Sequence, residues 1–136
     1  MTYLLDNSAF QQSMVNLRAA ELIDNLTRVG DLAVCSVVML EILYSTRDAS
    51  DWARLRDALD ALPRVEPQNP ARTIDTQEEL AARGQHRTSI IDVMVATTAA
   101  EHGLTVLHYD RDFERLGEVT GAGQEWIIPA GTGHQR

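Results

Sequence analysis

The chain opens with Thr2-Tyr3-Leu4-Leu5-Asp6-Asn7-Ser8, a short apolar run that ends in a carboxylate and passes into a polar segment. The same pattern returns late in the chain as Leu104-Thr105-Val106-Leu107-His108-Tyr109-Asp110. Short apolar runs bounded by polar residues are typical of buried strands. In open α/β sheets, ligands bind beyond the carboxyl ends of the strands. We therefore expect Asp6 and Asp110 to lie at a ligand-binding edge of a sheet.

Helical spacing alternates with short apolar runs between these two segments. We expect strands at 2–5, 32–35 and 104–108 with an edge strand at 126–128, and helices at 8–27, 36–45, 48–62, 70–83, 89–101 and 111–116. This alternation predicts an α/β fold, a three-layer α/β/α sandwich with a mostly parallel central sheet. A length of 136 residues fits one domain, which we place at 1–130, with a flexible tail at 131–136.

Two further carboxylates interrupt apolar runs inside the expected helices. Glu41 lies between Val37-Val38-Met39-Leu40 and Ile42-Leu43-Tyr44, and Asp92 follows Ile90-Ile91. A lone carboxylate removed from water must be protonated, paired or bound to a metal. If the fold brings these two acids together with those that follow the strands, their mutual repulsion favours a bound divalent cation. The pattern is typical of a hydrolase with a carboxylate-held metal.

Each of these acids also has a purely structural explanation. Asp6 or Asn7 could cap the helix that follows, and Asp110 could cap the helix that begins at 111. Ser89-Ile90-Ile91-Asp92 matches the capping-box pattern. Glu41 lies more than a turn inside its helix, so its alternative is a solvent-facing position on a half-buried helix. These alternatives stay open for single residues, whereas the conjunction of all four acids favours the metal site.

The composition excludes several classes of function. A net charge of −8 argues against nonspecific nucleic-acid binding through a broadly basic surface. All twelve basic residues are arginine, which excludes Schiff-base chemistry and a P-loop lysine. The single cysteine, Cys35, lies in an apolar stretch and is expected to be a buried, inert thiol. The four histidines show no paired spacing, which argues against a histidine zinc site. Without a signal peptide or a long apolar stretch, we expect a soluble, cytoplasmic protein.

Four motifs together resemble a PIN-domain ribonuclease. They are Tyr-Leu-Leu-Asp-Asn-Ser-Ala at 3–9, the isolated glutamate at 41 within 37–45, Ile-Ile-Asp-Val-Met-Val-Ala-Thr-Thr-Ala at 90–99, and His-Tyr-Asp-Arg-Asp-Phe at 108–113. The likeness is closest to VapC-type toxins of bacterial toxin–antitoxin pairs. It covers nearly the whole chain, with the motifs in the right order and at the right spacing.

This resemblance implies a role for each acid and for the polar residues beside it. The catalytic and metal-binding quartet would be Asp6, Glu41, Asp92 and Asp110. Asp112 would be an auxiliary acid, and Asn7 and Ser8 would be hydrogen-bonding groups behind the ligands. One departure is Ile90-Ile91, since the family often has a small residue or proline ahead of this aspartate. The relative weight of Asp110 and Asp112 as ligands stays open.

The resemblance also implies a cofactor, a substrate and partners. A set of carboxylate ligands suits Mg²⁺ or Mn²⁺ better than zinc. The expected activity is endonucleolytic hydrolysis of phosphodiester bonds in structured RNA, in a tRNA or rRNA loop, with one or two metal ions. The expected partners are a second copy of the chain in a homodimer and a cognate VapB-like antitoxin.

Two other functions fit parts of the sequence. A phosphatase with an aspartyl nucleophile would use the acid after the first strand, but it generally needs a second acid two residues on, where this chain has Ser8. Such enzymes also commonly use a lysine, which this chain lacks. A PIN-like binding module without catalysis is the other alternative. Because all four acids are present, nothing in the sequence argues for that loss.

Overall fold

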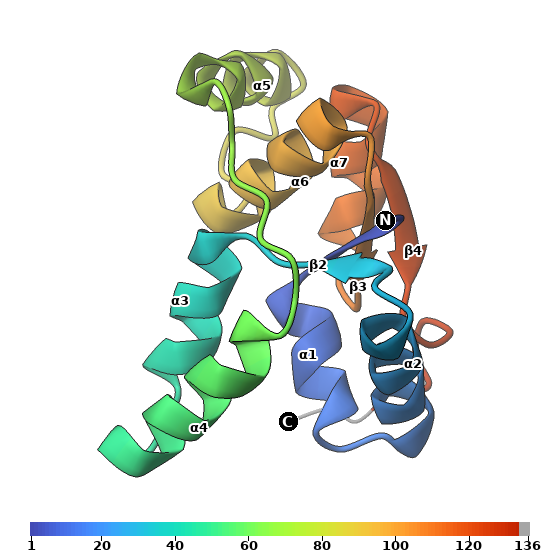
Figure 1. Ribbon diagram of the computed structural model, residues 1–136. Coiled ribbons are helices and arrows are strands. Elements are labelled where there is room, and N and C mark those ends of the chain that lie inside the picture. Colours follow the sequence, from blue (N-terminus) through green and yellow to red (C-terminus); the bar gives the residue numbers. More distant parts are fainter. Residues whose placement is uncertain (134–136) are drawn as a thin grey trace.

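The computed structural model describes residues 1–133, which form four strands and seven helices (Figure 1). In chain order they are β1 (Tyr3–Leu5), α1 (Asn7–Ser13), α2 (Leu17–Arg28), β2 (Leu32–Ala33), α3 (Ser36–Tyr44), α4 (Ala49–Asp60), α5 (Pro70–Ala82), α6 (Ile90–His102), β3 (Thr105–His108), α7 (Asp112–Thr120) and β4 (Gly123–Trp126).

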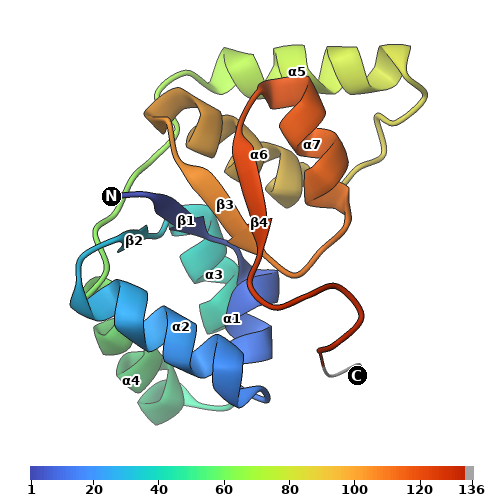
Figure 2. The same ribbon diagram turned by 90° about the vertical axis from the view of Figure 1, so that its right-hand side faces the viewer.

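The four strands form one parallel sheet in the order β2-β1-β3-β4. Helices α1 and α2 lie on one side of it, and α6 and α7 lie on the other with α5 beyond them (Figure 2). Parallel strands covered on both faces are expected to be continuously apolar, and Leu4, Leu5, Val106 and Leu107 are all buried. The predicted α/β/α sandwich is confirmed, and the sheet is parallel throughout.

The strand register brings the ends of β1 and β3 together. Leu5 pairs with Leu107, and the backbone N–H of Asp6 donates to the carbonyl of Leu107 at 3.0 Å. Both strands run in the same direction, so their carboxyl ends meet at one edge of the sheet. The acids that follow the two strands therefore share that edge, as the sequence predicted.

Helix α6 carries a nearly continuous apolar surface into the core. Val93, Val95, Ala96 and Ala99 are buried, and the helix ends at Gly103, which has a φ of 65°. Glycine at this position adopts the left-handed conformation without the steric cost that a Cβ would bring. Because α6 is held deep in the molecule, its first turn fixes the position of Asp92.

Four predicted elements are wrong in extent: the strand expected at 32–35 ends at Ala33, the helix expected at 111–116 runs to Thr120, and two others differ more. The single helix expected at 8–27 is two helices, α1 and α2, and the side chain of Asn16 caps α2 by accepting from the N–H of Ala19 at 3.1 Å. The expected edge strand at 126–128 is instead Gly123–Trp126, paired with β3. Ile127 and Ile128 are buried but follow the strand, so their apolar character reflects burial rather than strand pairing.

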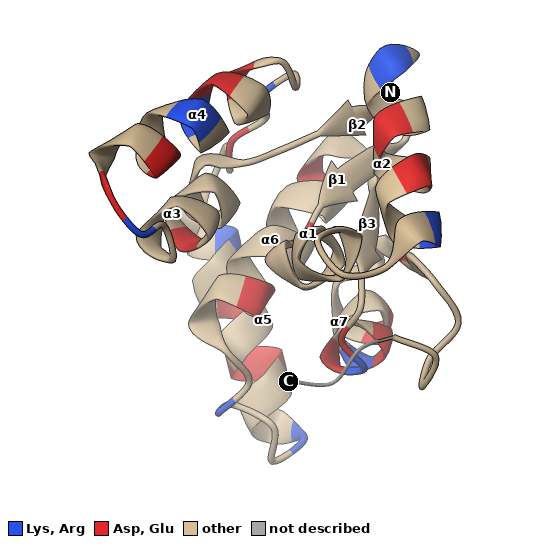
Figure 3. Cartoon of the chain, turned by 90° about the horizontal axis from the view of Figure 1, so that it is seen from below, with Lys and Arg blue, Asp and Glu red and all other residues tan. Residues whose placement is uncertain are grey.

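The prediction for the single cysteine agrees with the structure. Cys35 is buried, and burial raises the pKa of its thiol to about 11, as expected of an inert cysteine. Acidic and basic residues are interspersed along α4 (Figure 3), where Arg54 pairs with Asp51 and Arg56 with Asp60. Across residues 1–133, no helix is long and apolar enough to span a membrane. Of the predicted tail, residues 134–136 lie outside the described part, and the domain boundary stays a prediction.

Candidate metal centre

Five carboxylates approach one another at the carboxyl edge of the sheet. Asp6 follows β1 and caps α1, and Glu41 lies within α3. Asp92 lies in the first turn of α6, Asp110 follows β3, and Asp112 begins α7. The two sequence segments that predicted the sheet thus supply Asp6 and Asp110, and three helices supply the other three acids.

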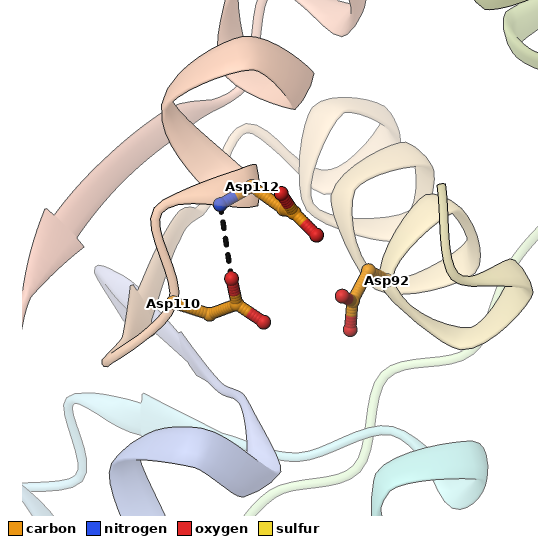
Figure 4. Close-up of side chains that lie close together, drawn as sticks. All are labelled: Asp92, Asp110 and Asp112. Carbon is orange, nitrogen blue, oxygen red and sulfur yellow. Dashed lines mark hydrogen bonds between the residues drawn. The ribbon is translucent and has the colours of Figure 1, made fainter. Parts of the chain in front are cut away.

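Asp92, Asp110 and Asp112 form the tightest group, which we call the aspartate triad. One carboxylate oxygen from each of them lies within 4.8 Å of those of the other two. Figure 4 shows Asp92 on α6 facing the two aspartates of the β3–α7 segment. The N–H of Asp112 donates to Asp110 Oδ1 at 3.0 Å, which ties these two acids together. The structure thus gives Asp112, expected to be auxiliary, a place beside Asp92 and Asp110.

Asp6 and Glu41 stand outside that triad but close enough to act on its charge. Burial is the main cause that raises the pKa of Asp92 to about 7, and the charges of Asp6, Asp110, Glu41 and Asp112 raise it further. Burial also raises the pKa of Glu41, with a second contribution from Asp6. All four acids of the predicted quartet therefore share one electrostatic environment, together with Asp112.

The buried oxygens of this site fit a bound cation. Asp6 is only 3% exposed, and within the described residues its Oδ1 has no hydrogen-bond partner. The same holds for Oε1 of Glu41. A buried carboxylate oxygen left without a partner is costly, and a divalent cation removes that cost. The ligands available are all carboxylate oxygens, which Mg²⁺ and Mn²⁺ prefer.

Ser8 links the Asp6 carboxylate to the neighbouring strand end. Its hydroxyl and its backbone N–H donate to Asp6 Oδ2 at 2.5 and 3.0 Å. The same hydroxyl oxygen accepts from the N–H of Tyr109 at 2.8 Å. Ser8 therefore makes the contact expected of a group behind a ligand. Asn7 accepts a hydrogen bond from Gln11 on α1 at 3.3 Å, and its part in the site stays a prediction.

The structural explanations for the acids are partly correct. Asp6 does cap α1, and Asp110 accepts the N–H of Asp112 at the start of α7. Capping is compatible with ligation, because each of these bonds uses one of the two carboxylate oxygens. The capping box at the start of α6 is wrong. In the described chain Ser89 makes no side-chain cap hydrogen bond, so Asp92 has no such role there.

Two further residues contact the triad, and neither was predicted from the sequence. Arg115 Nη2 pairs with Asp112 Oδ1 at 3.0 Å and donates to Thr88 Oγ1 at 3.3 Å, so it connects α7 to the loop before α6. Its spacing of three residues from Asp112 on one helix was the available signal. The fully buried His108 accepts the N–H of Asp110, and burial lowers its pKa. For His108, the available signal in the sequence was its position two residues before Asp110.

The family model of the PIN domain matches residues 3–119. This match spans β1 to α7 and includes every acid of the site. The chain therefore belongs to the PIN-domain family.

Relatives along the full length place the chain more narrowly. It is 39% identical over 135 residues to Ribonuclease VapC51 of Mycobacterium tuberculosis (strain ATCC 25618 / H37Rv), with 97% of each chain covered. It is 35% identical over 137 residues to Ribonuclease VapC18 of the same strain, covering 97% of this chain and 99% of the relative. Within the PIN domains, the chain is a member of the VapC family.

A solved structure shares the fold. The DNA-bound VapBC structure from Salmonella typhimurium includes a chain that superposes with a TM-score of 0.77 at 22% identity, covering 94% of this chain and 99% of that one. At this level of identity the likeness concerns the fold, and it agrees with the family assignment.

Proposed function

We propose that this protein is a metal-dependent endoribonuclease and the toxin of a toxin–antitoxin pair. The observation that carries the proposal is the aspartate triad, with its oxygens within 4.8 Å of one another, at the carboxyl edge of a parallel sheet. The full-length relatives that bear the name ribonuclease support hydrolysis of RNA. The net charge of −8 agrees with recognition of particular RNA shapes rather than general affinity for nucleic acid.

The cation would be held by carboxylate oxygens of the aspartate triad together with those of Asp6 and Glu41, whose Oδ1 and Oε1 have no partner in the described residues. When bound, Mg²⁺ or Mn²⁺ would activate a water molecule for attack and neutralise charge that develops on the scissile phosphate. The role of the chain itself is to hold the carboxylates in position for the cation. Ser8 fixes one oxygen of Asp6 and leaves Oδ1 without a partner in the described residues. Burial of these groups strengthens every charge interaction in the site.

The substrate we propose is a loop of a structured RNA, in a tRNA or an rRNA. Bases in single-stranded loops are unstacked and can be recognised along their edges, whereas the deep groove of an RNA helix is closed to side chains. All the basic residues of the chain are arginines, whose planar forks suit phosphate contacts. Arg115, which pairs with Asp112, supplies such a fork beside the acids.

Protein partners are also part of this proposal. The solved structures that share the fold include VapBC complexes, and the apolar surface of α3 supports a partner for this chain too. Leu40 is 67% exposed and Tyr44 is 92% exposed. Both line a cavity of about 470 Å³ beside Glu41, together with Val37 and Ile91. Exposed apolar surface of this kind marks interaction sites. We propose a VapB-like antitoxin as a partner, and a homodimer of the chain.

The proposed activity is tested by offering three substrates to the purified, antitoxin-free chain in Mg²⁺. They are total cellular RNA, single-stranded DNA and the small ester p-nitrophenyl phosphate. We expect discrete RNA fragments, whose mapped ends lie in loops, and an intact ester. Hydrolysis of the ester without RNA cleavage would identify a phosphatase instead. Folded protein that binds RNA but cleaves none of the three would identify a binding module.

A further inference from the structure

A buried histidine lies immediately before the acids of the β3–α7 segment. His108 is the last residue of β3 and is 0% exposed. Its ring packs between Phe113 and Trp126, with centroid distances of 5.0 and 5.1 Å. A polar ring buried this completely must satisfy both of its nitrogens with hydrogen bonds. The partners of those two nitrogens therefore show what the residue does.

The hydrogen bonds of His108 define its tautomer. The backbone N–H of Asp110 lies 3.0 Å from Nδ1, and a backbone N–H can only donate. Nδ1 must therefore be the unprotonated, accepting nitrogen. The proton then sits on Nε2, which lies 2.7 Å from Oε1 of Gln124 on β4 and donates to it. One ring thus joins the edge strand β4 to the backbone N–H of Asp110 in the site.

This contact is the first of two consecutive turns of the same kind. The side chain of His108 accepts the N–H two residues on, at Asp110, and the side chain of Asp110 accepts the N–H two residues further, at Asp112 (3.0 Å). This is the pattern of an Asx turn, in which a short polar side chain fixes the backbone two positions ahead. In the first turn a ring nitrogen takes the place of the usual amide or carboxylate oxygen.

We propose that His108 is the positioning residue of the aspartate triad. Its Nδ1 holds the backbone at Asp110, and Asp110 in turn holds the backbone at Asp112, so a ring fixed in the core sets where both carboxylates stand. The ring cannot rotate freely between Phe113 and Trp126, and Gln124 holds its far side. Partners that orient a metal ligand in this way commonly tune metal affinity. The inference rests on the proposed function only for its consequence, which is metal binding.

Two substitutions separate the two nitrogens of the ring. His108→Asn places an amide oxygen close to the position of Nδ1, so it keeps the acceptor for the N–H of Asp110. His108→Gln places its amide near the position of Nε2, so it keeps a donor for Gln124 but removes that acceptor. Both variants lose the ring and its packing, and each is therefore the control for the other. A residue that only filled the core would affect both variants alike.

The first readout uses metal-free protein and needs no activity. Amide hydrogen exchange, followed by NMR, should show the N–H of Asp110 protected in the wild type and in His108→Asn. The same N–H should exchange much faster in His108→Gln.

Affinity for Mg²⁺, measured by calorimetry, should be close to that of the wild type in His108→Asn. In His108→Gln it should fall roughly 10- to 100-fold, the usual cost of losing a group that orients a ligand. Equal exchange and equal affinity in the two variants would overturn the proposal.

A second measurement uses only the wild-type protein, so it tests the proposal even if both variants fail to fold. NMR of the ¹⁵N-labelled wild type reports which ring nitrogen of His108 carries the proton, and whether a coupling crosses the hydrogen bond from Asp110. We expect protonated Nε2 and a measurable coupling to Nδ1. A proton on Nδ1 would overturn the proposal, because that nitrogen could then accept nothing. This result is independent of RNA cleavage, so failure here is distinct from failure of the proposed ribonuclease.

Discussion

Asp6→Asn should lower the rate of RNA cleavage by more than about 100-fold while the fold stays intact. Even groups that only orient a metal ligand are worth roughly 10- to 100-fold, and Asp6 is proposed as a ligand itself. The asparagine keeps an oxygen that can accept from Ser8, so the cap of α1 survives. The substitution also removes one charge from a group of mutually repelling acids, so thermal stability of the metal-free protein should be unchanged or higher.

The matched control is Asp57→Asn, which makes the same chemical change at an exposed position on α4. Cleavage by this control should equal that of the wild type. Initial rates of cleavage of one purified RNA compare the two variants with the wild type, and circular dichroism verifies that both variants are folded. Full activity in Asp6→Asn would contradict the assignment of Asp6 to the metal site.

Asp92→Asn should change how the stability of the metal-free protein depends on pH. The pKa of Asp92 is about 7 in the folded chain, against roughly 4 for an unfolded aspartate. Between these two values the folded state keeps a proton that the unfolded state has released. The wild-type free energy of unfolding therefore loses this contribution as pH rises through that window, and the loss is complete above pH 7. Asparagine carries no such penalty, so the variant should gain on the wild type as pH rises from 5 to 8.

Comparison of the two proteins is needed because other groups titrate in the same window. Burial lowers the pKa of His108, which destabilises the folded protein as pH falls and opposes the effect of Asp92. Urea unfolding of both proteins at pH 5 and pH 8, in EDTA, isolates the contribution of the aspartate. A difference in unfolding free energy that is the same at both pH values would show that Asp92 is not held at a raised pKa. Mg²⁺ should stabilise the wild type at pH 8 and have little effect on Asp92→Asn.

The sequence predicted the four acids of the site that adjoin buried apolar segments. Asp6 and Asp110 follow apolar runs, and such runs become the buried parallel strands β1 and β3. Glu41 and Asp92 are conspicuous because each is an acid within an apolar helix. In each case the carboxylate lies next to apolar residues that pack in the core. The free-energy cost of burying a carboxylate there is evident from the sequence alone.

Other features depend on contacts that leave no pattern in one sequence. The break between α1 and α2 falls where Met14 and Leu17 keep helical spacing although both are exposed. Asp112 lies in a polar segment, so burial did not single it out, and only the family resemblance predicted an auxiliary acid at this position beside Asp92 and Asp110. The contact of His108 with Gln124 requires β4, which was predicted at 126–128 and begins three residues earlier, at Gly123.

The most direct test of the metal-dependent ribonuclease is a titration of metal-depleted protein with Mg²⁺, following cleavage of a single RNA. The proposed site predicts no cleavage in EDTA, and a saturable return of the same mapped fragments as Mg²⁺ is added. In Asp92→Asn the fragments should stay absent across the same range of Mg²⁺. Fragments that form equally well in EDTA, from protein free of contaminating nuclease, would contradict the account.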